Sequence, residues 1–189
     1  MSIINLIAGG RKANIDYFIT KSSLNTYSNT ISTLNGFQFY NAPVLTTVSF
    51  PNCSYIGSRV FCSCSRLNSL SFPVCETVGY NAFQSCTALV SVDFPACTQI
   101  YPNAFDNCTS LASLSFPLCT SVGAYAFYRC TALTSVYFPK CTIIWYSAFE
   151  DCSALTSANF PICDSIDRYA FHQCTALTSI NVPACTSIN

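Results

Sequence analysis

The chain has 189 residues, of which 51% are hydrophobic and only 8% are charged, whereas globular proteins usually carry about 25% charged residues. Eight Lys and Arg balance eight Asp and Glu. There is thus no excess of positive charge to neutralise phosphates, and we expect no nucleic-acid partner. The longest apolar stretch near the start, Ile3 to Ala8, is interrupted by Asn5. It is too short for a membrane span or a signal-peptide core, so we expect no membrane insertion.

Residues 1–25 follow no repeat and are expected to form an N-terminal extension or cap. Residues 26–45 read as an atypical first repeat, because their apolar positions lie 22 residues before those of the next unit. The matching pairs are Leu34 with Ile56, Phe39 with Phe61, and Leu45 with Leu67. Solenoids shield the open end of their core with such atypical units. We therefore expect a repeat domain over residues 26–189, which ends in mid-repeat.

From residue 50 onward the sequence repeats every 22 residues without a slip. Each unit starts with Phe-Pro, or Val-Pro in the last one, and the first members of these pairs are Phe50, Phe72, Phe94, Phe116, Phe138, Phe160 and Val182. A first cysteine column follows two residues after each Pro, at Cys53, Cys75, Cys97, Cys119, Cys141, Cys163 and Cys185. A second cysteine column lies three residues after a second Phe column, at Cys64, Cys86, Cys108, Cys130, Cys152 and Cys174. A fixed period of this length is typical of a solenoid, in which each unit buries its apolar residues against its neighbours.

One unit predicts the local structure of them all. Val136 and Phe138 alternate with Ser and Tyr, which favours a short half-buried strand. Pro139 ends that strand, because proline cannot donate to a ladder. Farther along, Ala148 and Cys152 are spaced four apart, which favours a single helical or 3-10 turn. We therefore expect each unit to hold a strand, a turn, a short helical turn and a return.

Residues 166–183 read I-D-R-Y-A-F-H-Q-C-T-A-L-T-S-I-N-V-P. This string resembles the bacterial surface-protein (BspA-like, Treponema-type) class of leucine-rich repeats, whose pattern is I-G-x-x-A-F-x-x-C-x-x-L-x-x-I-x-I-P. The resemblance covers about residues 26–189 and implies an α/β solenoid, a right-handed leucine-rich-repeat superhelix of 22-residue units. It also implies a short-stranded parallel sheet on the concave face and short helical or 3-10 turns on the other face.

The same resemblance implies roles in adhesion and protein binding at cell surfaces. Similar arrays occur in tail and virion-associated proteins of phages of gut bacteria, so a cell-surface, secreted or virion-associated location is favoured. We hypothesise a non-catalytic recognition module that binds protein or carbohydrate. The alternative is a structural spacer or assembly solenoid that forms a homodimer through its uncapped C-terminal end.

The chain contains 14 cysteines, a number that would suggest disulfides or metal in a small secreted protein. Thirteen belong to the two columns, where side chains about 5 Å apart should point in parallel into the core. Because parallel side chains rarely give the torsion of a disulfide, we expect buried free thiols, which fit a reducing or anaerobic setting. Cys62 lies outside the columns, where its side chain can be exposed, and its C-x-C motif with Cys64 lacks the further ligands of a zinc site.

The sequence offers no constellation for catalysis. His172 is the only histidine and follows Phe171 at a position that varies between units, so we expect a solvated loop residue. Glu150 and Asp151 form the only adjacent acidic pair and are expected in a solvated turn. General-base or triad chemistry needs a nucleophile, a base and an orienting group from fixed places. We therefore expect no enzyme activity, no cofactor and no metal.

Two sets of residues that break the repeat are candidates for binding. The first set occupies outward strand positions expected on the concave face, namely Asp93, Ser115, Tyr137, Asn159 and Asn181. The second set is an aromatic patch made of Tyr80, Tyr101, Tyr125, Tyr128, Trp145, Tyr146 and Tyr169. Aromatic side chains with a polar tip are enriched at interaction surfaces. In the alternative interpretation, the strand positions vary because nothing constrains them and the aromatic residues cover the repeat's own turns.

Overall fold

A computed structural model describes residues 23–25 and 31–189 of the chain. Residues 1–22 and 26–30 lie outside that part. They include most of the predicted N-terminal extension and its boundary with the repeat domain, which therefore stay predictions. The regular secondary structure of the described residues consists of short strands. Among these residues, no helix is long and apolar enough to cross a membrane.

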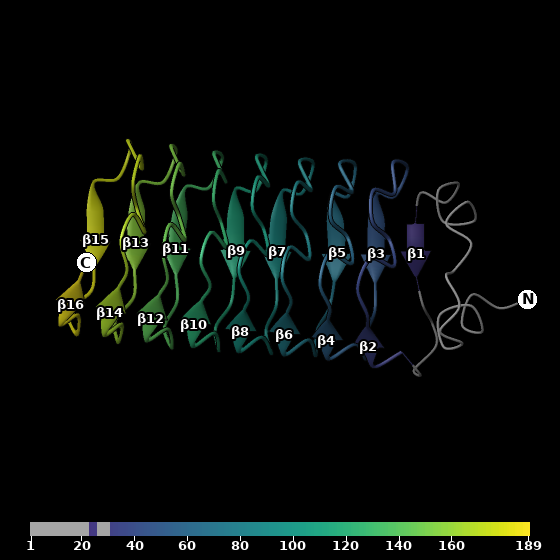
Figure 1. The fold of residues 1–189 in the computed structure, drawn as a ribbon, viewed down its shortest axis with the longest axis horizontal. Helices are drawn as coiled ribbons and strands as arrows, with labels where there is room; N and C mark the ends of the chain where they lie inside the picture. The colour runs from purple at the N-terminus through teal and green to yellow at the C-terminus, as the bar shows by residue number, and fades with distance from the viewer. Residues whose placement is uncertain (1–22, 26–30) are drawn as a thin grey trace, which may run out of the picture.

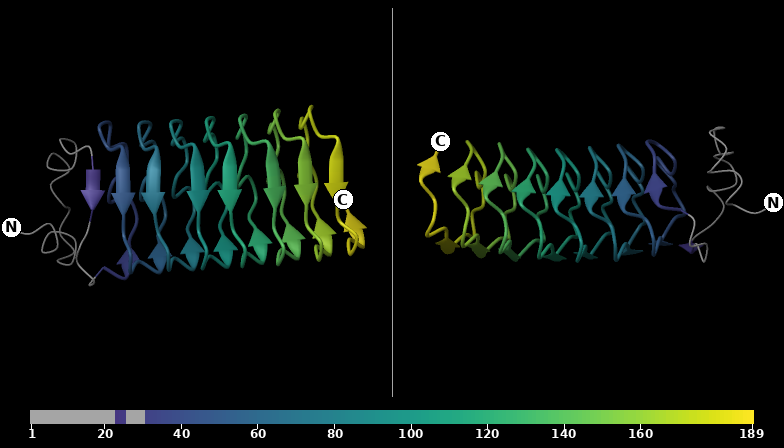
Figure 2. Two further views of the ribbon diagram at one scale, coloured as in Figure 1. Left: turned by 180° about the vertical axis from the view of Figure 1, so that it is seen from behind. Right: turned by 90° about the horizontal axis from the view of Figure 1, so that it is seen from below.

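The strands form two rows along the solenoid (Figures 1 and 2). The long-strand row holds β1 (Ser23–Asn25), β3 (Thr47–Ser49), β5 (Ser69–Ser71), β7 (Ser91–Asp93), β9 (Ser113–Ser115), β11 (Ser135–Tyr137), β13 (Ser157–Asn159) and β15 (Ser179–Asn181). The short-strand row holds β2 (Thr33–Leu34), β4 (Tyr55–Ile56), β6 (Thr77–Val78), β8 (Gln99–Ile100), β10 (Ser121–Val122), β12 (Ile143–Ile144), β14 (Ser165–Ile166) and β16 (Ser187–Ile188). The prediction of a solenoid with parallel strands is thus confirmed.

The 22-residue period sets the register of the sheets. The short strands form one eight-stranded parallel sheet, whereas the long strands divide into β1-β3-β5, β7-β9 and β11-β13-β15. From β2 onward, each paired residue faces the one 22 positions later, as Val136 faces Ala158. A strict period therefore places every side chain of one coil beside its counterpart in the next.

Two stacked columns of phenylalanine fill the interior. The rings of the column from Phe39 to Phe171 lie 5.1–5.4 Å apart between centroids, with planes within 9° of parallel. The rings from Phe50 to Phe160 are 5.4–5.9 Å apart, and the two columns meet at steep angles, such as 65° between Phe105 and Phe116. Such pairs add about 0.5–1.5 kcal/mol each beyond the burial of apolar area. The core is therefore one continuous aromatic column, as the sequence predicted.

The segment predicted as a helical or 3-10 turn is not helical. Ser147 and Asp151 have φ angles of 53° and 60°, which a right-handed helix excludes. The backbone N–H of Phe149 donates to the carbonyl of Ala170 in the next coil at 2.8 Å, a partner that a helix would not use. The prediction from the spacing of Ala148 and Cys152 is therefore wrong, and two successive turns bonded to the neighbouring coil occupy this side.

All fourteen cysteines lie in the described residues and are free thiols. In the first column each thiol donates to the carbonyl two residues later, as Cys119 does to Ser121 at 3.2 Å. In the second column each donates to a Phe carbonyl of the preceding coil, as Cys108 does to Phe83 at 3.2 Å. Even Cys62 is only 5% exposed. The cysteines of the columns thus act as small apolar side chains whose single donor is satisfied.

Burial changes the acidity of these thiols. It raises the pKa of Cys64, Cys97 and Cys119 to about 12, because a thiolate loses its hydration inside an apolar core. Since the thiolate is the reactive form, such thiols are slow nucleophiles near neutral pH.

We expect the folded protein to react very slowly with a chromogenic disulfide reagent at about pH 8. After unfolding in denaturant without reductant, all fourteen thiols should react. The pre-reduced, unfolded protein serves as the control for the total. Fewer than about twelve reactive thiols in freshly purified protein would contradict the free-thiol core and indicate disulfides, and fast reaction before unfolding would contradict burial.

Candidate binding surfaces

The five strand positions predicted for binding lie in line along the long-strand row. Asp93 faces Ser115, and Tyr137 faces Asn159, which in turn faces Asn181. Tyr137 is 57% exposed, and the side-chain amide of Asn181 donates to Oδ1 of Asn159 at 3.0 Å. The structure therefore brings these five side chains to one surface, which we call the strand face. Their role in binding stays a prediction.

The seven aromatic residues predicted as one patch divide into two groups. Four of them form a tyrosine row, made of Tyr125, Tyr128, Tyr146 and Tyr169. Ring centroids in this row lie 5.3–5.6 Å apart in edge-to-face contacts, and the ring of His172 extends it at 5.4 Å from Tyr169. These rings cover one another and the turns below, which favours the alternative interpretation for this group.

The other three aromatic residues surround an open groove beside strands β8, β10 and β12. The groove has a volume of about 370 Å³, and its lining residues are Tyr80, Gln99, Ile100, Tyr101, Pro102, Ser121, Gly123, Ala124 and Trp145. The rings of Tyr80 and Tyr101 are 4.9 Å apart. The indole Nε1–H of Trp145 donates to the Ser121 hydroxyl at 3.0 Å. We call this site the aromatic groove.

A glycine accounts for the space between two of the rings. Tyr101, Gly123 and Trp145 occupy equivalent positions in three successive coils. A Cβ at Gly123 would lie 2.7 Å from backbone atoms of Tyr101 and Pro102, so no side chain fits there unless the backbone shifts. Tyr101 and Trp145 are therefore separated by bare backbone and the small side chain of Ala124.

Sequence reasoning found the three aromatic residues of the groove but missed the rest of its lining. Gln99, Ser121 and Gly123 belong to columns that carry other residue types in other coils. The signal that could have found them was the glycine between two large aromatic residues at a spacing of 22 on each side. That signal becomes visible only when the repeats are aligned column by column.

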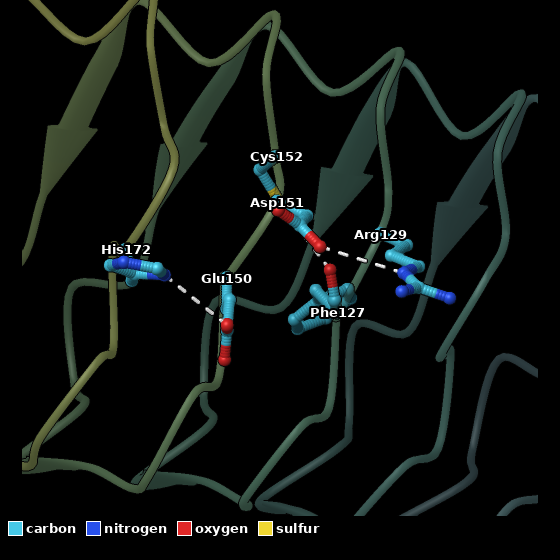
Figure 3. A network of polar contacts seen from close by, with 6 residues as sticks. All are labelled: Phe127, Arg129, Glu150, Asp151, Cys152 and His172. Atoms are coloured by element: carbon cyan, nitrogen blue, oxygen red, sulfur yellow. Dashed lines mark hydrogen bonds and ion pairs between the residues drawn. The ribbon is translucent and has the colours of Figure 1, made fainter.

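The turn side of the solenoid carries polar pairs between neighbouring coils (Figure 3). Nδ1 of His172 lies 3.3 Å from Oε1 of Glu150, and Nε of Arg129 lies 3.5 Å from Oδ2 of Asp151. His172 therefore has a carboxylate partner, but no nucleophilic side chain joins this pair in the contacts of residues 31–189. Within the same part of the chain, no group of three or more His, Cys, Asp or Glu side chains could hold a metal ion.

A second chain of polar side chains crosses two coils of the turn side. Asn81 donates to Oε1 of Gln84 at 3.0 Å, and Nε2 of Gln84 donates to Oδ2 of Asp106 at 2.6 Å. Burial raises the pKa of the Asp106 carboxyl, while the Gln84 hydrogen bond and the charge of Arg129 partly offset this effect. Asp106 is thus a half-buried acid that connects coils, and its contacts are structural.

We expect Asp106→Asn to raise the thermal midpoint at pH 7. A carboxyl whose pKa is raised by folding binds protons more tightly when folded, so its ionisation lowers stability as the pH rises through the folded-state pKa. Asparagine keeps an acceptor for Gln84 and does not ionise. The gain should therefore shrink as the pH falls toward about 4, where the acid itself becomes protonated.

Thermal unfolding followed by circular dichroism between about pH 4 and pH 7 measures this difference. The same change at Asp93, which is exposed on the strand face, controls for the loss of one negative charge. A midpoint for Asp106→Asn that is lower than that of the original protein at pH 7 would contradict a carboxylate destabilised by burial.

Comparison with known structures places the coils among bacterial repeat proteins. A leucine rich cell surface protein from Faecalibacterium prausnitzii A2-165 is 22% identical, with a TM-score of 0.60 over 82% of this chain and 52% of that one. A leucine-rich repeat protein from Eubacterium ventriosum ATCC 27560 is 26% identical, with a TM-score of 0.57 over 70% of this chain and 43% of that one. The chain thus spans about half the length of these relatives.

A third similar structure is TLR13 in its complex with ssRNA13, at 20% identity and a TM-score of 0.59 over 87% of this chain and 25% of that one. At this identity the likeness concerns the fold alone. No curated protein matches the chain in sequence. Residues 17–112 and 98–189 match the BspA type leucine rich repeat region of 6 copies. The match spans nearly the whole repeat domain, and the chain belongs to the BspA-type leucine-rich repeat family.

Proposed function

We propose that this chain is a non-catalytic recognition module, which binds a protein or a glycan at a cell or virion surface. The observation that carries the proposal is a separation of roles within each coil. The repeated Phe, Cys and Leu columns are buried, whereas the residues that differ from coil to coil lie on the strand face and around the aromatic groove. A rigid core with variable exposed side chains is how solenoids form extended binding surfaces.

The composition of the two surfaces supports a protein or glycan partner. They carry Tyr, Trp, Asn and Ser with little charge, and such side chains supply contact area and adaptable hydrogen bonds. Because Lys and Arg only balance Asp and Glu over the whole chain, binding to phosphate backbones is not favoured. The likeness to the TLR13 complex does not alter this inference, since it extends only to the fold.

The proposed location rests on the relatives. The Faecalibacterium prausnitzii structure is described as a cell surface protein, and it is similar to this chain over most of the described repeats. A cell surface or virion is therefore the favoured setting for the recognition module. The free, buried thiols add that a reducing or anaerobic environment would suit the folded chain.

Self-association through the C-terminal coil is the second candidate function, that of a spacer or assembly solenoid. One specific observation favours it, because Ile180 is 46% exposed and Ile188 is 72% exposed, whereas their counterparts Ala158 and Ile166 are 2% and 4% exposed. Another copy of the chain or a further coil that covered β15 and β16 would bury both side chains.

Binding of the purified protein to protein and glycan arrays tests the proposed function. We expect at least one saturable ligand, and we expect Tyr137→Ala combined with Asn159→Ala to weaken a ligand of the strand face at least tenfold, since few residues carry most of an interface's energy. Ile162→Ser, an exposed apolar residue on a separate turn, is the matched control and should leave binding unchanged.

Light scattering on the same protein separates the two candidate functions. A monomer that binds an array ligand supports recognition. A concentration-dependent dimer that Ile188→Lys converts to a monomer, together with no array ligand, would contradict recognition and favour the assembly solenoid.

A further inference from the structure

We propose that the aromatic groove binds a neutral oligosaccharide, with one sugar ring held between Tyr101 and Trp145. This inference deepens the proposed recognition function and rests on it, because it assigns a ligand class to one of the two surfaces. The groove is open to solvent, and Tyr80 and Trp145 on its walls are 49% and 45% exposed. Its aromatic surface is thus available to a ligand.

The spacing of the two walls suits a single ring. Tyr101 and Trp145 lie two coils apart, and neighbouring coils bonded as parallel strands are about 4.8 Å apart, so the two backbones are separated by roughly 9.6 Å. Gly123 and Ala124 leave that interval without a large side chain. A flat ring that contacts an aromatic wall on each side needs about 7–8 Å between the walls, at a carbon contact distance near 3.5–4.0 Å. The interval therefore admits one such ring and not two.

The chemistry of the lining favours a neutral polyol. No charged residue is among the nine that line the groove, so it offers nothing to a phosphate, a carboxylate or an ammonium group. The Gln99 amide and the Ser121 hydroxyl lie beside each other in register on β8 and β10, where they can exchange hydrogen bonds with hydroxyl groups. Apolar walls with a few polar groups are typical of sites that orient a small ligand. A sugar presents both apolar C–H faces and hydroxyl edges.

The groove also differs from the tyrosine row in how its rings are partnered. Tyr125, Tyr146 and Tyr169 pack edge-to-face on one another. In the part of the chain that the structure describes, by contrast, no aromatic ring packs against Trp145. Its indole is instead held by the hydrogen bond to Ser121. A half-exposed indole that is already fixed in place loses little conformational freedom on binding, which favours a ligand.

Trp145 is the only tryptophan of the chain, so its fluorescence reports on the groove without any mutation. The probes are six neutral hexasaccharides, built from glucose in β-1,4 and α-1,4 linkage, mannose, galactose, xylose and N-acetylglucosamine. We expect at least one to change the emission saturably, with a Kd of about 0.1–1 mM, as befits a small open site. No saturable change with any of the six at up to about 10 mM would overturn the proposal.

Variants measured by calorimetry place the binding. Trp145→Ala and Tyr101→Ala should each weaken binding at least tenfold. Ala124→Tyr should abolish it by filling the groove, and it should fold, because Tyr80 and Tyr146 occupy the same column in other coils. Tyr169→Ala, in the tyrosine row, is the matched control and should stay within twofold. Thermal midpoints close to the original show that each variant is folded.

Two outcomes would overturn the assignment of the ligand. One is saccharide binding that persists in Trp145→Ala and Ala124→Tyr, which would place the sugar elsewhere. The other is a proline-rich decapeptide that binds the groove while none of the six sugars does, since aromatic grooves also accept such peptides. In either case an array ligand of the strand face would leave the proposed recognition function standing, so the two failures can be told apart.

Discussion

Hydrogen bonding between equivalent positions of successive coils is the constraint on which the rest of this structure depends. The N–H of Phe105 meets the carbonyl of Ala126 and the N–H of Phe127 meets that of Ala148, each at 2.8 Å. The same geometry recurs on the strand rows, where partners are 22 residues apart. Inserting or deleting one residue in a coil would displace every later donor from its acceptor. A strict period is therefore a requirement of the backbone, and the columns of Phe and Cys follow from it.

This requirement also determines where function can lie. A buried position must suit the identical residue above and below it, which favours side chains that stack, such as Phe, or that pack closely and satisfy their own donor, such as Cys. Exposed positions carry no such demand. The aromatic groove illustrates the consequence, since it arises where one outer column changes from Tyr101 to Gly123 to Trp145 while the core beneath stays regular. A new binding site can thus appear without any cost to the solenoid.

Much of the fold was predictable because the period of the sequence equals the period of the structure. The parallel register, the buried Phe columns and the free thiols all follow from stacking identical units. The turn side was predicted wrongly, because the spacing of Ala148 and Cys152 fits a helical turn and two successive turns equally well. Left-handed residues decide between them, and asparagines such as Asn103 and Asn107, with φ near 59°, were the favourable signs. The groove escaped prediction because its lining comes from several coils, and side-chain direction in a turn is not readable from the period.

Amide hydrogen exchange, followed residue by residue by NMR, tests most directly whether the turn segments join the coils. The amides of Phe105 and Phe127 should exchange as slowly as those of β8 and β10, more than about 10³-fold slower than an unprotected amide. The amides of Thr131 and Ala132, which donate no backbone hydrogen bond within the described residues, should exchange fast. If Phe105 instead exchanges as fast as Ala132, the coils are not bonded through their turn segments, and these hydrogen bonds cannot be what enforces the fixed period and aligns the core.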